Sequence, residues 1–203
     1  YRDGEVIAPG TVIISAAGNC NDITKVVEPV LQKDGGSIYY INLSKDNYKL
    51  GGSSFAQVRN AIGNEAPTIK DSVYFKIVFN SIQALIKDSQ IVAGHDIASG
   101  GLITTLLEMC FADNDLGAKL DLSGLGEEDT IKLLFSENAG IVFQAKNDSI
   151  EKVLKDANID FVKIGEVLEE GTLTVKHNRV KMGLNISSLR DTWFKTSYLL
   201  DNK

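Results

Sequence analysis

The chain has 203 residues and a formal net charge of −6, and its composition is 43% hydrophobic and 24% charged. These values are typical of a globular protein that buries a core, and they argue against a disordered chain or a basic nucleic-acid-binding protein. No apolar run reaches the length of a membrane span, and no signal segment opens the sequence. Because the chain opens at Tyr1 and its two cysteines lack metal-ligand spacing, we expect a cytoplasmic piece of a longer polypeptide.

Strand and helix patterns alternate in the first half of the chain. The β-branched run from Thr11 to Ala17 predicts a buried strand, and Asp22 caps a short helix that carries Val26 and Val27. We further expect a strand at 37–43, a helix at 55–62 capped by Ser53 or Ser54, a strand at 90–93 and a helix after Gly101. Between them Asp71 begins a longer helix with one apolar stripe, made of Tyr74, Ile77, Val78, Ile82 and Leu85.

The second half of the chain is richer in strands. We expect strands at 117–122, 140–145, 161–168, 173–176 and 179–182, and helices at 128–135, 149–157 and 188–200. In the helix at 149–157, Val153 and Leu154 should face inward. The last two strands form a hairpin across His177 and Asn178, which leaves His177 in solvent. Interleaved strands and helices with a strand-rich tail favour an α+β or layered α/β/α domain with a mixed sheet.

The segment 94–102, GHDIASGGL, joins a predicted strand to a predicted helix. Asp96 would lie at the carboxyl end of the strand, where open α/β sheets bind ligands, and a carboxylate beside a phosphate suits Mg²⁺. The amides of Gly100 and Gly101 at the start of the helix favour an anion such as phosphate. The alternative is a plain strand–turn–helix junction with Asp96 or Ser99 as the helix cap, and residue types alone favour it.

A second glycine-rich segment, LGGSSFAQ at 50–57, also precedes a predicted helix. Gly51, Gly52 and Ser53 would form a second phosphate cradle from backbone amides and a hydroxyl. The alternative is an ordinary glycine turn with a serine cap. Neither segment is a Walker A loop or a G-x-G-x-x-G fingerprint, so each signal is weak by itself.

Several other polar residues are candidates for a functional role. Ser136 and Glu137 in LFSENAG precede a strand and would meet a ligand there, although such residues more often cap a helix or face water. His95 is either a general base or a residue that packs and hydrogen-bonds beside Asp96, and we favour the second interpretation. Cys20 has no visible base or electropositive setting, so a catalytic thiol is not expected.

Taken in order, LGGSSFAQV, GHDIASGGLITTLLEMCFA, LGAKLDL and LFSENAGIVFQ resemble the C-terminal domain of the AIR-synthase-related (PurM-like) superfamily. The opening PGTVIISAAGNCNDITKVVEPVLQ and the ending SSLRDTWFKTSYLLDNK resemble the long, single-chain members that act in purine biosynthesis. The resemblance implies a ferredoxin-related α+β domain over 1–203. Its core would lie at about 10–168, and a helix at 188–203 would lead toward a glutaminase domain.

The long members of this superfamily use ATP to activate the formamide oxygen of formylglycinamide ribonucleotide, and ammonia from glutamine then displaces the phosphate. The resemblance therefore implies an ATP-dependent C–N ligase with ATP or ADP and Mg²⁺ as cofactors. It also implies partner domains in the same polypeptide, namely N-terminal PurM-like domains and a C-terminal glutaminase. Because the N-terminal domains supply most metal ligands and the catalytic histidine, no catalytic residue is assigned to this chain, and the isolated chain should be inactive. No nucleic-acid or membrane partner is expected.

Residue by residue, Asp96 matches the family's His-Asp position and inherits a contact to Mg²⁺ and to nucleotide phosphate. The family commonly has His-Asp-x-Ser-Asp-Gly-Gly, whereas Ala98 and Ser99 stand here, so one hydroxyl and one carboxylate are missing. The full set that the resemblance implies for a nucleotide or substrate phosphate site is Gly51, Gly52, Ser53, His95, Asp96, Ser99, Gly100, Gly101 and Glu137.

Two other interpretations stay open. The altered motif favours a structural module that holds an auxiliary ADP–Mg²⁺ without turnover. The superfamily also contains other ATP-dependent synthetases and kinases, although the two chain ends resemble the long purine enzymes more closely.

Overall fold

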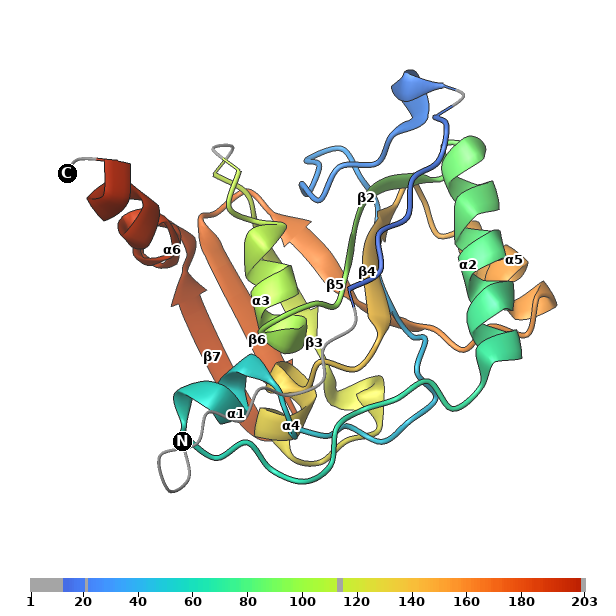
Figure 1. Cartoon of the computed structure of the whole chain (residues 1–203). Helices are drawn as coiled ribbons and strands as arrows, with labels where there is room; N and C mark the ends of the chain where they lie inside the picture. Colours follow the sequence, from blue (N-terminus) through green and yellow to red (C-terminus); the bar gives the residue numbers. More distant parts are fainter. Residues whose placement is uncertain (1–12, 21, 113–114, 202–203) are drawn as a thin grey trace.

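The computed structural model describes residues 13–20, 22–112 and 115–201, which form one seven-stranded mixed sheet with helices around it (Figure 1). The strand order is β2-β4-β1-β5-β3-β6-β7, and β3 and β6 form the parallel pair, whereas the other neighbours are antiparallel. The strands are β1 (Ile38–Asn42), β2 (Ile91–Asp96), β3 (Gly117–Asp121), β4 (Gly140–Ala145), β5 (Val162–Leu168), β6 (Thr172–His177) and β7 (Val180–Asn185).

The described chain also contains six α-helices and two 3₁₀ helices. They are η1 (Ile23–Lys25), α1 (Ser54–Val58), α2 (Ser72–Lys87), α3 (Gly101–Glu108), η2 (Ser123–Leu125), α4 (Thr130–Phe135), α5 (Ile150–Asp156) and α6 (Ile186–Asp201). The helix expected to begin at Asp71 begins one residue later, and Asp71 is its N-cap, since its carboxylate accepts hydrogen bonds from the amides of Val73 and Tyr74. Among the described residues, no helix has the length and apolar character needed to cross a membrane.

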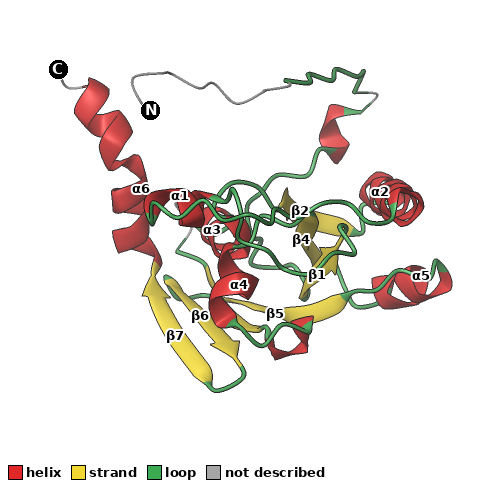
Figure 2. Ribbon diagram, turned by 60° about the horizontal axis from the view of Figure 1, so that its bottom comes forward, coloured by secondary structure: helices red, strands yellow, loops and turns green. Residues whose placement is uncertain are grey.

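The sheet is covered on both faces at β1 and β4. Tyr39 and Ile41 of β1 point into a core shared with α2 and α5, and Ile38 and Tyr40 point into a second core shared with α3 and α4. Figures 1 and 2 show α2 and α5 side by side, separated from α3 and α4 by the sheet. Because successive strand residues alternate between faces, an apolar run such as IYYI is stable only between two layers. The expected layered α/β/α arrangement with a mixed sheet is therefore confirmed.

The described residues cover the β5-β3-β6-β7 half of the sheet on one face only. Leu120, Leu173 and Val175 are buried against α3 and α4, whereas Lys119 and Lys181 are exposed on the opposite face. Strands β6 and β7 lie at residues 172–185, so the sheet includes residues beyond 168. Helix α6 follows β7, and its Trp193 ring lies 6.0 Å from that of Phe111, which follows α3. The C-terminal end of α6 projects from the rest of the fold (Figure 2).

The prediction of a strand from Thr11 to Ala17 is wrong for its described part. Residues 13–17 have no regular structure, and Ile13 is 87% exposed; residues 11 and 12 lie outside the described residues. β-branched residues favour a pleated surface, but a strand also needs a neighbour to receive its hydrogen bonds, and this segment has none in the sheet. The helix capped by Asp22 ends at Lys25, so Val26 and Val27 follow it instead of lying within it.

Helix α1 is shorter than predicted, and two apolar side chains on other helices, which were predicted to be buried, face outward. The helix ends at Val58 because Asn60 adopts a left-handed backbone conformation with φ of 54°. Ile77 is 43% exposed, because at 100° per residue it lies about a quarter-turn from the centre of the buried stripe on α2. Val153 of α5 is likewise exposed, whereas Leu154 is buried as predicted.

The prediction of a solvated His177 is wrong. The turn of the hairpin is Asn178–Arg179, so His177 is the last residue of β6, paired with Val180, and is 1% exposed. Its Nδ1 is 2.8 Å from Thr130 Oγ1, and its Nε2 is 2.8 Å from the Glu127 carbonyl oxygen. The imidazole therefore connects the start of α4 to the sheet.

Candidate functional site

The two glycine-rich segments predicted as phosphate cradles meet at Glu137. The Oε1 atom of Glu137 accepts a hydrogen bond from the Ser54 amide at 2.8 Å and one from the Gly100 amide at 2.8 Å. Ser54 opens α1, and Gly100 is the N-cap residue of α3. One carboxylate oxygen thus joins two loops that belong to distant parts of the sequence. We refer to residues 50–54, 97–101 and 136–138 together as the junction.

The first loop of the junction is closed by hydrogen bonds within the chain. The Gly51 amide donates to the Glu65 carbonyl at 2.8 Å, and the Gly52 amide donates to the Ile62 carbonyl at 2.8 Å. Ser53 is buried and is the N-cap of α1, because its Oγ accepts from the Ala56 amide. A phosphate that bound to the Gly51 or Gly52 amide would have to replace one of these bonds.

The second loop depends on two glycines in the left-handed region. Gly100 has φ of 91° and Gly101 has φ of 75°, which L-residues with a side chain rarely adopt. A Cβ atom on Gly101 would lie 2.8 Å from the Leu134 and Ser136 carbonyl oxygens. The close packing of α3 against the end of α4 therefore requires glycine at residue 101.

The third loop of the junction contains a residue that the sequence analysis missed. Asn138 is buried, and its Nδ2 donates to Ser44 Oγ at 3.0 Å and to the Asn47 carbonyl at 3.1 Å. These bonds hold the segment that leads from β1 into the first glycine loop. Ser136 is also buried, and its Oγ has no hydrogen-bond partner among the described residues. The only sequence signal was a run of three polar residues between two apolar segments.

Asp96 and His95 lie at the end of β2 and not within the junction's hydrogen bonds. β2 ends at Asp96, as the ligand-binding interpretation required. The Asp96 side chain is 78% exposed, and its Oδ1 lies 3.3 Å from His95 Nδ1. The other ring nitrogen of His95 lies 3.2 Å from a carboxylate oxygen of Glu108 on α3. The same Nδ1 atom is 2.8 Å from the Asp96 backbone oxygen, which also accepts from the buried Thr105 hydroxyl at 3.1 Å. The imidazole therefore lies between the Asp96 and Glu108 carboxylates.

The predicted site residues thus fall into two groups. Gly51, Gly52 and Ser53 are connected through Ser54 and Glu137 to the loop that contains Ser99, Gly100 and Gly101, whereas His95 and Asp96 line a hollow of about 350 Å³ beside α2. No group of three His, Cys, Asp or Glu residues in the described chain has metal-binding geometry. Mg²⁺ usually takes one or two protein carboxylates and completes its shell with water and phosphate oxygens. The exposed Asp96 carboxylate therefore fits the metal as a single ligand.

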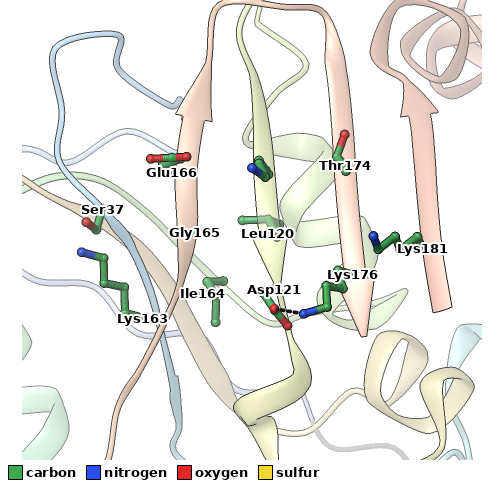
Figure 3. Close-up of a pocket in the computed structure, with 11 residues that line it drawn as sticks. Ser37, Leu120, Asp121, Lys163, Ile164, Gly165, Glu166, Thr174, Lys176 and Lys181 are labelled. Carbon is green, nitrogen blue, oxygen red and sulfur yellow. Dashed lines mark hydrogen bonds and ion pairs between the residues drawn. The ribbon is translucent and has the colours of Figure 1, made fainter. Parts of the chain in front are cut away.

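A separate hollow of about 640 Å³ lies on the uncovered face of the sheet (Figure 3). It contains none of the predicted site residues. Lys119, Lys163, Lys176 and Lys181 line it together with two carboxylates. In Figure 3 the Lys176 ammonium points at the Asp121 carboxylate, and the two groups are 2.6 Å apart. That hydrogen bond, with those from Ser123, lowers the pKa of Asp121 to about 2.

A mixed sheet with glycine-rich loops at the start of its helices is the arrangement expected for an AIR-synthase-type domain, and comparison with known families identifies one. Residues 33–178 match the family described as AIR synthase related protein, C-terminal domain. The chain belongs to this family.

Named relatives narrow the comparison to one enzyme. The chain is 40% identical over 208 residues to a probable phosphoribosylformylglycinamidine synthase of Arabidopsis thaliana, described as chloroplastic/mitochondrial, and 34% identical over 209 residues to the Homo sapiens phosphoribosylformylglycinamidine synthase. These alignments cover 99% and 97% of the chain, respectively, but the chain spans only 15% of the length of each relative.

Solved structures share the fold at low sequence identity. PurL from Thermotoga maritima complexed with FGAR gives a TM-score of 0.64 at 18% identity, over 83% of this chain and 30% of that one. The same protein complexed with ATP gives a TM-score of 0.62 at 15% identity, over 83% of this chain and 28% of that one. This likeness confirms the fold expected from the sequence.

Proposed function

We propose that this chain is part of a formylglycinamidine ribonucleotide synthase and forms one side of a nucleotide or substrate phosphate site. The observation that carries the proposal is the similarity to named synthases along 97–99% of the chain. The reaction would be the ATP- and glutamine-dependent conversion of formylglycinamide ribonucleotide to the amidine. The compartment we propose is the cytoplasm.

The site proposed for the phosphate consists of the junction and the end of β2. The ligand would contact Gly51, Gly52 and Ser53 on one side and Gly100 and Gly101 on the other, with His95, Asp96, Ser99 and Glu137 around it. The complexes of Thermotoga maritima PurL with ATP and with FGAR support a nucleotide and a ribonucleotide as the bound molecules. Mg²⁺ would neutralise phosphate charge, with Asp96 as the ligand from this chain.

The proposed catalytic unit is larger than this chain. The chain spans 15% of the length of the relatives, so N-terminal PurM-like domains and a glutaminase domain of the same polypeptide are the partners we propose. The 203-residue chain alone is expected to show no turnover, because it contains no residue to which we assign catalysis.

A second candidate function is an auxiliary module that holds ADP without turnover. One observation favours it: Ala98 and Ser99 stand where the family commonly has a serine and an aspartate, so a hydroxyl and a carboxylate are missing from the loop. A loop without these two groups has fewer side chains for a reacting phosphate, which supports a structural role more directly than a catalytic one.

Asp96→Ala in the complete polypeptide distinguishes the two functions. The control is Asp34→Ala, which removes an exposed carboxylate from the turn before β1. Two quantities are measured: substrate-dependent ADP release with glutamine present, and the nucleotide that copurifies with the protein.

A fall in kcat/KM with unchanged copurifying nucleotide would support the synthase site. Loss of copurifying ADP and a lower Tm, with turnover restored by added ADP, would support the auxiliary module. If Asp96→Ala behaved like Asp34→Ala in both measurements, the assignment of Asp96 would be wrong.

A further inference from the structure

The Glu137 carboxylate occupies a place in which a ligand anion would be expected. Its Oε1 atom accepts from two backbone amides, one 83 residues and the other 37 residues away along the chain. One of these amides belongs to the N-cap of α3, where the helix dipole favours a negative charge. Hydrogen bonds from amides to an ionised carboxylate are also stronger than those between neutral groups.

The backbone on both sides of Glu137 is anchored independently of its carboxylate. Before it, residues 134–136 pack against Gly101 so closely that a Cβ would not fit. After it, Asn138 is buried and bound to the segment between β1 and the first glycine loop. The anchored backbone therefore fixes the position of the carboxylate. The carboxylate in turn fixes the distance between the two glycine loops.

We propose that Glu137 is a positioning residue that sets the distance between the two glycine loops and takes the amides of Ser54 and Gly100 in place of a ligand anion. A phosphate cannot share these two amides with the carboxylate, because like charges in a partly buried site repel. The ligand would therefore meet loops that are already fixed, and would contact Gly100 and its neighbours through atoms other than the amides of Ser54 and Gly100. The proposal depends on the proposed function only for the identity of that ligand.

Three variants of the 203-residue chain test this role. Glu137→Ala removes the acceptor, Glu137→Gln keeps an acceptor oxygen of the same shape without the charge, and Glu128→Ala is the control because Glu128 is an exposed residue two positions before α4. The measurement is amide hydrogen exchange by NMR at Ser54 and Gly100, with amides of β1 and β4 as internal references. Formate is then added as a free carboxylate.

Glu137→Ala should speed exchange at both amides together by about tenfold or more, while the reference amides and Glu128→Ala stay within about twofold of the original chain. Glu137→Gln should give intermediate protection. Formate should restore protection at both amides in Glu137→Ala with saturation, and should change neither amide in the unmodified chain.

Faster exchange at only one amide, or at neither, would overturn the bridging role. Failure of formate to protect the two amides would show that a carboxylate at this place is not what holds them. If Glu137→Ala unfolds, the comparison between Glu137→Gln and the unmodified chain decides, and equal protection there would also overturn the proposal. Because no nucleotide is present, a failed Asp96 experiment leaves this inference standing, and the reverse also holds.

Discussion

Replacing Gly101 with alanine tests whether close packing of α3 against the end of α4 holds the junction together. Two costs are expected. An L-residue at φ of 75° costs about 1 kcal/mol, and the added Cβ would lie 2.8 Å from two carbonyl oxygens, where neither neighbour is a flexible side chain. Overpacking of this kind costs about 1–3 kcal/mol, so the total is about 2–4 kcal/mol.

Gly52→Ala is the matched control for this prediction. Gly52 has φ of 76°, almost equal to that of Gly101, but a Cβ there would have no neighbour within 4 Å. Gly52→Ala should therefore lose only the backbone cost of about 1 kcal/mol. The difference between the two variants isolates the contribution of the contact.

Urea unfolding monitored by circular dichroism measures both variants. With a slope of about 2 kcal/mol per M, the midpoint should fall by about 1–2 M for Gly101→Ala and by about 0.5 M for Gly52→Ala. Equal shifts in the two variants would refute the reasoning, because they would show that the left-handed backbone alone accounts for the loss.

Three further predictions concern a carboxylate, the thiols and a buried imidazole. The hydrogen bond from Lys176 lowers the pKa of Asp121 to about 2, so the stability that Asp121 contributes is present above its unfolded pKa and is lost as the pH falls toward 2. Asp121→Asn should flatten this acidic part of the plot of urea midpoint against pH. Parallel plots for the two proteins would contradict the prediction. In the folded chain, a thiol reagent should modify the exposed Cys20 and spare the buried Cys110, whose pKa is raised to about 12 by burial, until urea exposes it; equal rates for the two thiols would contradict this. His177→Ala should lower the free energy of unfolding by about 2–4 kcal/mol, through two lost hydrogen bonds and a cavity; a loss below about 0.5 kcal/mol would indicate a solvated side chain.

Local sequence patterns were sufficient to predict the elements that are determined by neighbouring residues. The strand at 140–145 was predicted with the bounds that it has, and the start of α2 was predicted to within one residue, because residue alternation and helix starts are short-range properties. The exposure of residues 13–17 was not predictable in this way, since the same β-branched pattern forms a strand only beside a partner. The prediction that His177 is exposed failed for a related reason. The partners that bury this side chain come from the start of α4 and the residues before it, almost 50 residues earlier.

The glycine loops were found from sequence, but their connection was not. Glycines before a helix identify a place where backbone amides are accessible, and both such places are present. What binds those amides depends on the tertiary structure, and here the acceptor is Glu137, from a third segment. Asn138 was missed because a buried asparagine and a solvated one have the same sequence pattern until its partners are known.

The strand order has a consequence for how this chain folds during synthesis. β1, β2 and β4 are neighbours and are complete once residue 145 has been made, so this half of the sheet can form early. β3 pairs only with β5 and β6, so it must wait for about forty further residues after Asp121 before its first neighbour exists. During that interval a ribosome-bound chain exposes the apolar face of an unpaired strand, which is the kind of surface that chaperones bind and that aggregates when translation stalls.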